Sequence, residues 1–496
     1  MDTLYYTKLS PTPSYPPTND QRPTTILFHR PSTIDHRPSP IDHPMLFNSY
    51  NFIFIFLLPV ILIYRLLPVG YRVWFLIVAS IIFYGEWSLE HLFILLCSVC
   101  FNYLAFLWLQ KVNSLKRWWL GGFIVLDLLP LGYFKYSYFL HLSPTHHLLP
   151  LAISFFTFQQ IAFLVDSYKK KIKPKSFKEY LFFVLFFPQL VAGPIVHYKE
   201  LIPQILSPKW AKFDAEKFRV GIVLFAMGLF KKVVLADNLS CIADTAFATP
   251  ALNTYEAWMG IFAYTLQIYF DFSGYADMAV GLGLLFGIKL PINFDSPYKS
   301  DGIIQFWRRW HITLSRFLRD YVYIPLGGNR NGEFKKITNL LITMSIGGIW
   351  HGAGWGFLLW GLAHGVFLSI EHIIADTKKL TSHKAKTVKV FFTFMIVTLL
   401  WVLFRADDIS KAYDYYKALF DLKDFHIGGF TPSKEGLIAT GLLIVWLLPN
   451  SFELTGYKTA HLTDKKWIYT TAGILLFISL KLMAQTPSKA FVYFNF

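Results

Sequence analysis

The sequence predicts an all-α polytopic membrane protein. Of its 496 residues, 54% are hydrophobic and 18% are aromatic, and the mean hydropathy is +0.41. The interior of a soluble protein of this length cannot hide that much apolar surface, whereas a bilayer supplies apolar surroundings directly. Apolar runs of about 20 residues, the length of a membrane-spanning helix, recur from residue 45 almost to the end of the chain. We therefore expect one membrane body rather than several soluble domains.

Residues 1–44 differ from the rest of the chain. They are rich in Pro, Thr and His and lack apolar periodicity, which predicts a disordered N-terminal extension. Met45 then opens the run MLFNSYNFIFIFLLPVILIY, which leads directly into a first spanning helix. We expect residues 45–496 to form the membrane domain and Met45 to be the natural start, with 1–44 either a dispensable tail or an upstream mis-start.

The membrane domain is expected to hold about eleven transmembrane helices together with re-entrant or interfacial ones. Its apolar stretches lie near 47–66, 71–87, 91–110, 118–140, 149–168, 180–196, 218–236, 257–288, 303–325, 339–374, 388–406, 436–449 and 466–484.

Three of these stretches do not have the pattern of a simple span. The stretch 180–196 carries Pro188 and Gly193-Pro194, so it should bend or re-enter the membrane. The stretch 339–374 is long enough for two helices, and we expect breaks near Gly347-Gly348 and Gly352.

The third unusual stretch, 303–325, is amphipathic. Its apolar residues include Trp307 and Trp310, and its basic residues include Arg308 and Arg309. This pattern predicts a helix at the membrane interface or along a cavity.

The net charge of +16 is distributed as in a membrane protein. Lys and Arg occupy short polar gaps between apolar runs, such as Lys169–Lys171, which is typical of cytoplasmic loops. The rule that basic loops stay inside places the loop 169–178 in the cytoplasm and residue 45 outside, with the protein in the bacterial cytoplasmic (inner) membrane. No nucleic-acid partner is expected.

Ionisable residues gather in apolar sequence between about Tyr264 and His364. Each Asp, Arg or Lys at the bilayer centre costs about 2.5–3.5 kcal/mol, so the cluster indicates a polar, protein-lined cavity. For Asp271, pairing with an Arg elsewhere in the bundle is favoured over contact with a substrate. Arg308 and Arg309 fit two roles equally, either binding an anion such as a donor's phosphate or reaching the lipid headgroups.

Two histidines are candidates for chemistry. His351 lies in ITMSIGGIWHGAGWGFLLWGLAHG, among small residues and beside Trp350. A neutral imidazole there could take a proton from a hydroxyl nucleophile, although a packed histidine between helices fits equally well. His311 follows the Arg308-Arg309 pair and could be catalytic or a hydrogen-bonded structural residue. No metal site is predicted.

These residues stand in motifs that resemble the membrane-bound O-acyltransferase (MBOAT) superfamily, in particular its bacterial alginate O-acetyltransferase (AlgI-like) branch. The resemblance covers essentially all of 45–496. The motifs are ISFFTFQQIAFLVDSYKK at 153–170, FFPQLVAGPIVHYKELIPQI at 186–205, GLFKKVVLADNL at 228–239, YFDFSGYADMAVGLGLLFGI at 269–288, FWRRWHITLSRFLRDYVYIPLGGNR at 306–330 and GGIWHGAGW at 347–355.

The resemblance implies a ring of helices around a central funnel through a locally thinned membrane. It implies that His351 is the general base, or the residue whose loss abolishes transfer, and that His311 orients or stabilises the acyl intermediate. Contacts with the donor or substrate are expected from Trp307, Arg308, Arg309, Trp310, Asn293, Asp271 and Trp350.

The resemblance also implies a function. An acyl group, here acetyl, would pass from a cytoplasmic donor, acetyl-CoA or an acyl carrier thioester, to an alginate-like extracytoplasmic polysaccharide, directly or through an SGNH-like acetyltransferase partner. No bound cofactor is expected. The alternatives are O-acetylation of peptidoglycan, D-alanylation of teichoic acid with an acyl carrier protein as donor, and, less favoured because no inverted repeat is visible, a transporter.

Overall fold

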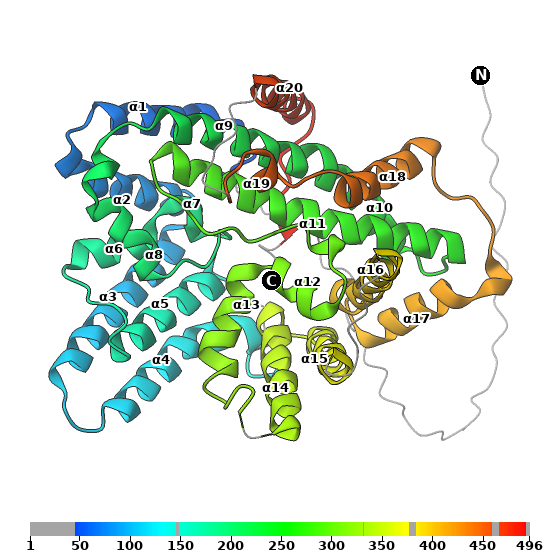
Figure 1. Cartoon of the computed structure of the whole chain (residues 1–496), viewed down its shortest axis with the longest axis horizontal. Helices are drawn as coiled ribbons and strands as arrows, with labels where there is room; N and C mark the ends of the chain where they lie inside the picture. The colour runs from blue at the N-terminus through cyan, green and yellow to red at the C-terminus, as the bar shows by residue number, and fades with distance from the viewer. Residues whose placement is uncertain (1–44, 145–147, 331, 376–382, 459–465, 493–496) are drawn as a thin grey trace, which may run out of the picture. The chain divides into compact units, whose positions relative to one another are not determined.

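The computed structural model describes residues 45–144, 148–330, 332–375, 383–458 and 466–492. These residues form helices joined by short connections and contain no β-strand, which confirms the predicted all-α fold (Figure 1). The predicted extension 1–44 lies outside the described residues.

The membrane body consists of two runs of helices on either side of the long helix α11. The first run comprises α1 (Leu58–Leu66), α2 (Val69–Gly85), α3 (Leu89–Lys111), α4 (Lys116–Tyr136), α5 (Ile153–Tyr168), α6 (Phe177–Leu185), α7 (Phe187–Leu190), α8 (Tyr198–Leu206), α9 (Ala215–Phe230) and α10 (Asp237–Ala248). The second comprises α11 (Thr254–Leu285), α12 (Ile303–Arg309), α13 (Ile312–Leu318), α14 (Glu333–His351), α15 (Trp355–Ala375), α16 (His383–Arg405), α17 (Ile409–Phe420), α18 (Pro432–Leu447), α19 (Ser451–Leu454) and α20 (Lys466–Met483). Three π-helical stretches, η1 (Asn51–Leu57), η3 (Lys231–Ala236) and η5 (Arg319–Tyr323), join or extend these helices.

Four of the described helices are long and apolar enough to cross a membrane on their own. They contain the spans Leu89–Lys111, Trp355–Ile374, Lys386–Arg405 and Lys466–Met483. Only 22% to 44% of each span is buried against the protein, so most of their apolar surface faces outward. Exposed apolar surface of this extent suits lipid rather than water as the surrounding medium. Asn51–Leu66 and Val69–Gly85 are shorter apolar helices, and the total of about eleven spans stays a prediction.

Helix α11 forms the buried centre of the membrane body. Its N-terminus carries a capping box: the Asn253 side chain accepts a hydrogen bond from the Glu256 N–H at 3.0 Å, and the Glu256 carboxylate accepts one from the Asn253 N–H at 3.2 Å. Nearly every residue from Ala263 to Leu285 is buried, as expected for a helix that is apolar on all sides. In Figure 1, α11 runs across the middle of the body with α9 and α10 beside it.

Small residues let α9 and α11 pack backbone against backbone. A Cβ atom on Gly281 would lie 2.6 Å from the Gly221 carbonyl oxygen, and one on Gly274 would lie 2.8 Å from the Gly228 carbonyl oxygen. Both pairs are spaced seven residues apart on each helix, so they lie on one face. The glycine-rich run 281–287 therefore serves close helix packing rather than nucleotide binding.

The stretches with unusual patterns are broken in the structure. The run 180–196 ends α6 at Leu185, forms the single turn of α7 and then continues as buried irregular backbone, which confirms the predicted bend. The run 339–374 is divided between α14 and α15 by a break at 352–354, as expected at Gly352. The predicted break at Gly347-Gly348 is wrong, because these glycines lie inside α14 and serve a helix contact instead.

The run 303–325 is not one amphipathic helix but three short ones, α12, α13 and η5. Its predicted two-sidedness is nevertheless present, since Trp307 and Trp310 are buried while Arg308 is exposed and Arg309 half-buried. The chain turns sharply between α12 and α13, at His311.

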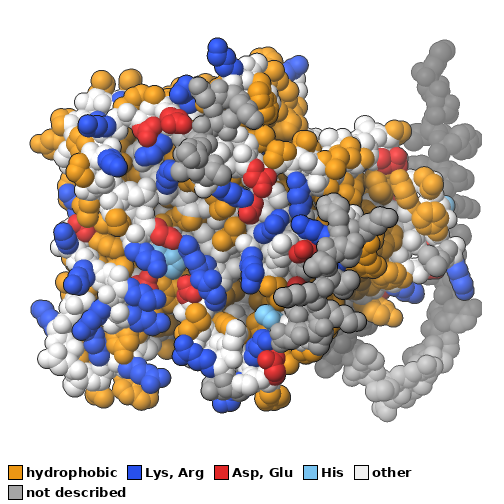
Figure 2. Space-filling view, viewed as in Figure 1, with side chains coloured by type: hydrophobic (Ala, Val, Ile, Leu, Met, Phe, Trp, Pro, Cys, Tyr) orange, Lys and Arg blue, Asp and Glu red, His pale blue; other side chains and the backbone are white. Residues whose placement is uncertain are grey.

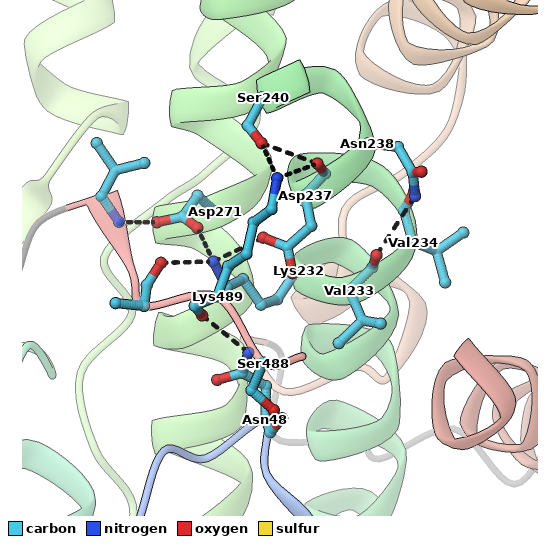
Figure 3. Close-up of polar contacts among 12 residues, drawn as sticks. Asn48, Lys232, Val233, Val234, Asp237, Asn238, Ser240, Asp271, Ser488 and Lys489 are labelled. Atoms are coloured by element: carbon cyan, nitrogen blue, oxygen red, sulfur yellow. Dashed lines mark hydrogen bonds and ion pairs between the residues drawn. The ribbon is translucent and has the colours of Figure 1, made fainter. Parts of the chain in front are cut away.

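The first and last described segments of the membrane body lie side by side (Figure 3). The Asn48 side-chain amide donates to the Lys489 carbonyl at 3.1 Å, and the Ser488 hydroxyl donates to the Asn48 carbonyl at 2.8 Å. The Tyr50 hydroxyl donates to the Leu480 carbonyl at 2.6 Å. The two ends of the described body are therefore joined by hydrogen bonds.

Candidate active site

His351 is the last residue of α14, and close packing of α14 on α15 fixes its position. A Cβ atom on Gly361 would lie 3.0 Å from the Cα atom of Gly348, so the two helices touch through their backbones one turn before His351. The predicted use of glycines for close approach is correct here. The contact places the buried His351 ring against side chains of α15.

Aromatic side chains from three helices surround the His351 imidazole, which is 2% exposed. Its ring centroid lies 4.9 Å from that of Trp350, 5.2 Å from that of Trp360 on α15 and 5.1 Å from that of Phe404 on α16. All three contacts are edge-on, the geometry that aromatic pairs favour. The result is an apolar slot around one imidazole.

His311 is held in a conformation that few residues other than glycine adopt. Its φ is +41°, in the left-handed region, and it stands directly before the first residue of α13. The Asn293 side-chain oxygen lies 3.3 Å from His311 Nδ1. The same oxygen accepts hydrogen bonds from the Thr313 N–H at 3.1 Å and the Thr313 hydroxyl at 2.9 Å. This network maintains a strained backbone of the kind found at functional sites.

Trp350 stands between the two predicted histidines. Its ring centroid is 6.2 Å from that of His311 and 4.9 Å from that of His351. Phe155 and Phe158 of α5 pack on its other sides, at 5.6 and 5.2 Å. Two histidines that are 40 positions apart (351 − 311) are thus brought to one buried aromatic cluster.

A third histidine, His364 on α15, joins the same cluster. Trp307 donates its indole N–H to His364 Nδ1 at 3.2 Å. Trp360 lies between His364 and His351, with ring centroids 4.9 and 5.2 Å away. Sequence reasoning noted His364 as an intramembrane polar group but gave it no role; its place in the same apolar run as His351 was the available signal.

The remaining predicted aromatic and basic residues lie at the edge of this cluster. Trp310 packs against Trp401 of α16, with ring centroids 5.1 Å apart. Arg308 is exposed and Arg309 half-buried, and neither guanidinium has an acidic partner among the described residues. Figure 2 shows Lys and Arg side chains gathered over the middle of one face, in the region of α8 and α13. Both predicted roles of the arginines remain open.

Asp271 belongs to a separate buried ion cluster, shown in Figure 3. Lys232 of η3 places its ammonium nitrogen 2.7 Å from Asp271 Oδ1 and 2.8 Å from Asp237 Oδ1. The second Asp271 oxygen accepts a hydrogen bond from the Val492 N–H at 2.9 Å. The expectation of an ion pair is met by a lysine rather than an arginine, and the carboxylate binds the C-terminal segment.

Asp271 nevertheless borders the histidine cluster through its neighbour. The Phe272 ring contacts the His311 imidazole edge-on, at 4.7 Å between centroids. Successive residues of a helix point about 100° apart, so α11 presents one side to the histidines and another to the ion cluster.

Two side chains that sequence reasoning missed contact the end of α14. Lys135 and Tyr136, the last residues of α4, donate hydrogen bonds to the carbonyl oxygens of Trp350 and Ile349. No local pattern identifies them, because the contact joins residues more than 200 positions apart. Among the described residues, no group of three or more His, Cys, Asp or Glu side chains is arranged to hold a metal ion.

The chain is similar to known proteins over most of its length. The family model described as MBOAT, membrane-bound O-acyltransferase family, matches residues 104–404. The peptidoglycan O-acetyltransferase of Helicobacter pylori is 38% identical, over 91% of this chain and 98% of its own. The protein named probable alginate O-acetylase AlgI in Pseudomonas putida is 39% identical, over 91% and 100%. The teichoic acid D-alanyltransferase of Streptococcus thermophilus is 30% identical, over 51% and 68%.

Proposed function

Because the chain belongs to the membrane-bound O-acyltransferase family and is an integral, multi-pass membrane enzyme, we propose that it O-acetylates an extracytoplasmic polysaccharide. The acetyl group would come from a cytoplasmic thioester, acetyl-CoA or an acyl carrier thioester, and cross the cytoplasmic membrane. Two relatives that match 91% of this chain are named for O-acetylation, whereas the D-alanyltransferase matches 51%. A transporter is no longer a competing reading, since the family is one of acyltransferases.

The observation that carries the proposal is the placement of His351 in its aromatic slot. A neutral imidazole there takes the proton from the acceptor hydroxyl as the oxygen attacks the thioester carbonyl. The C–O bond of the ester forms, the C–S bond breaks, and the imidazolium returns the proton to the leaving thiolate. The aromatic walls exclude water, which would otherwise compete with the acceptor hydroxyl.

His311 is the second participant in the proposed reaction. The bond between its Nδ1 and Asn293 fixes the ring, and Trp350 separates it from His351. From there its Nε2 side can orient or stabilise the acyl intermediate. Trp307 acts indirectly, by fixing the ring of His364.

The wider architecture follows from the same proposal. The helices would form a ring around a funnel through a thinned bilayer, with about eleven spans. The three intramembrane histidines would then stand where the two mouths of the funnel meet. Arg308 and Arg309, which lack acidic partners, would attract the donor's phosphates at the cytoplasmic mouth.

Two alternatives keep the enzyme class and change the acceptor. Peptidoglycan O-acetylation is favoured by the Helicobacter relative, which matches the chain as fully as the alginate relative does. D-alanylation of teichoic acid would require an acyl carrier protein at the basic cytoplasmic face. For O-acetylation we propose a periplasmic or membrane-anchored SGNH-like acetyltransferase as the partner that completes transfer.

A deletion strain distinguishes these acceptors. Base-labile acetate would be measured separately in secreted polysaccharide and in purified muropeptides, and base-labile D-alanine in teichoic acid, with and without the wild-type gene. The proposal predicts loss of acetate from the secreted polysaccharide alone. Loss confined to muropeptides or to D-alanine would assign the corresponding alternative, and unchanged values in all three fractions would contradict the proposed function.

A further inference from the structure

The C-terminal end of α14 is capped by side chains from α4. The last four carbonyls of an α-helix have no partner within the helix. Here the Tyr136 hydroxyl donates to the Ile349 carbonyl at 2.6 Å, and the Lys135 ammonium donates to the Trp350 carbonyl. Both carbonyls lie directly before His351.

The Lys135 contact differs from the Tyr136 contact because it carries charge. A cation at a helix C-terminus interacts favourably with the partial negative charge of the unpaired carbonyls. The same ammonium nitrogen lies 5.6 Å from the centroid of the Trp350 ring, which adds a cation–π contact. One amine thus holds both the backbone and the side chain of the residue that precedes His351.

No acidic side chain among the described residues competes for this amine. The ion pairs of the described chain do not include Lys135, and the other ionisable residue inside α4, Asp127, accepts a hydrogen bond from Asn102 at 2.6 Å. The half-buried ammonium of Lys135 is therefore committed to the end of α14. A charged donor in an apolar helix is costly, so its retention at this point needs a purpose.

The chain after His351 cannot supply the missing restraint. It continues as Gly352-Ala353-Gly354, and Gly352 adopts an extended conformation rather than closing the helix end with a backbone hydrogen bond. Glycine permits many backbone conformations, so the last turn of α14 depends on contacts from other helices. Lys135 supplies the charged one.

We propose that Lys135 is a positioning residue, whose bond to the Trp350 carbonyl sets the orientation of the His351 imidazole for acyl transfer. This inference rests on the proposed role of His351. It assigns to α4 a part in the active site that neither the motifs around His351 nor the family match reveals. Lys135 acts through α14 and does not contact the substrate.

The test compares full-length variants in a strain that lacks the chromosomal gene. The variants are Lys135→Met, Lys135→Arg, Tyr136→Phe and His351→Ala, each with an N-terminal tag. The readout is the rate at which base-labile acetate and D-alanine accumulate on secreted and envelope glycans. Dividing that rate by the amount of monodisperse enzyme recovered in mild detergent separates activity per molecule from the yield of folded protein.

The inference predicts that Lys135→Met lowers the rate per folded molecule at least about tenfold, while the recovered amount changes little. Lys135→Arg should restore the rate to within about threefold of wild type, because a guanidinium also donates to a carbonyl and keeps the charge. Tyr136→Phe, the matched loss of an uncharged cap, should stay within about twofold.

A merely structural role for Lys135 would lower the yield and leave the rate per molecule unchanged, which would overturn the inference. If Lys135→Met yields no folded enzyme, Lys135→Gln replaces it, and a Gln variant as active per molecule as the Arg variant has the same consequence. A His351→Ala variant with the wild-type rate would instead refute the proposed function, whatever the lysine variants show.

Discussion

Replacing Lys232 by methionine should destabilise the membrane body strongly. The Lys232 side chain is 1% exposed and lies between Asp271, which is 2% exposed, and Asp237. Removing one partner from a buried ion pair leaves an uncompensated charge and costs about 3–5 kcal/mol. An unfolding entropy of about 2.1 cal/mol/K per residue over roughly 450 residues makes each degree of Tm worth roughly 1 kcal/mol. The expected fall in Tm is therefore about 3 to 5 °C.

The assay is thermal unfolding in detergent, followed by the loss of the monodisperse peak on size exclusion. The control is Lys411→Met, which breaks an exposed pair with Asp407 whose side chains are 58% and 63% exposed. Such a pair contributes about 0.5 kcal/mol or less, so Tm should stay within about a degree of wild type. The double variant Lys232→Met/Asp271→Asn should lose less than the two single changes combined, because it leaves fewer buried charges unpaired. A Lys232→Met protein as stable as Lys411→Met would refute the reasoning.

Three further changes test other parts of the structure. Gly281→Leu should cost about 1–3 kcal/mol or more and reduce the yield of folded protein, because even its Cβ atom would collide with the α9 backbone; unchanged yield would contradict that contact. Asn293→Ala should lower acyl transfer per folded molecule about tenfold by freeing the ring of His311, measured as ester content, and wild-type transfer would refute the proposed orientation. Trp307→Phe removes the donor to His364 and should lower stability by about 1–3 kcal/mol, seen as a reduced Tm; an unaltered Tm would show that this hydrogen bond contributes little.

Local composition was enough to predict the helical class and several breaks. Gly352 ends α14 as its sequence context indicated, and the prolines of 180–196 break that segment. The turn at His311 was not predictable, because the apolar pattern continues through WRRWHITL and nothing in it marks a left-handed histidine. Asn293 and Thr313, which stabilise that conformation, meet it only in the folded chain.

Long-range contacts account for what the sequence could not reveal. The pairing of Asp271 was expected, but its partner Lys232 lies in a π-helical stretch whose register cannot be read from periodicity. The contact of Lys135 with the end of α14 joins segments that share no motif. In both cases the residue type was visible, whereas its partner depended on how distant helices pack.

The central claim is that His351 is the general base of acyl transfer. The most direct measurement is the rate of glycan ester formation per folded molecule for His351→Ala and His351→Gln, with His91→Ala on α3 as the control. General-base catalysis contributes about 10²–10⁴-fold, so both His351 variants should lose at least about a hundredfold while the His91 variant stays near wild type. A folded His351→Ala enzyme that retains more than about a tenth of the wild-type rate would contradict the account.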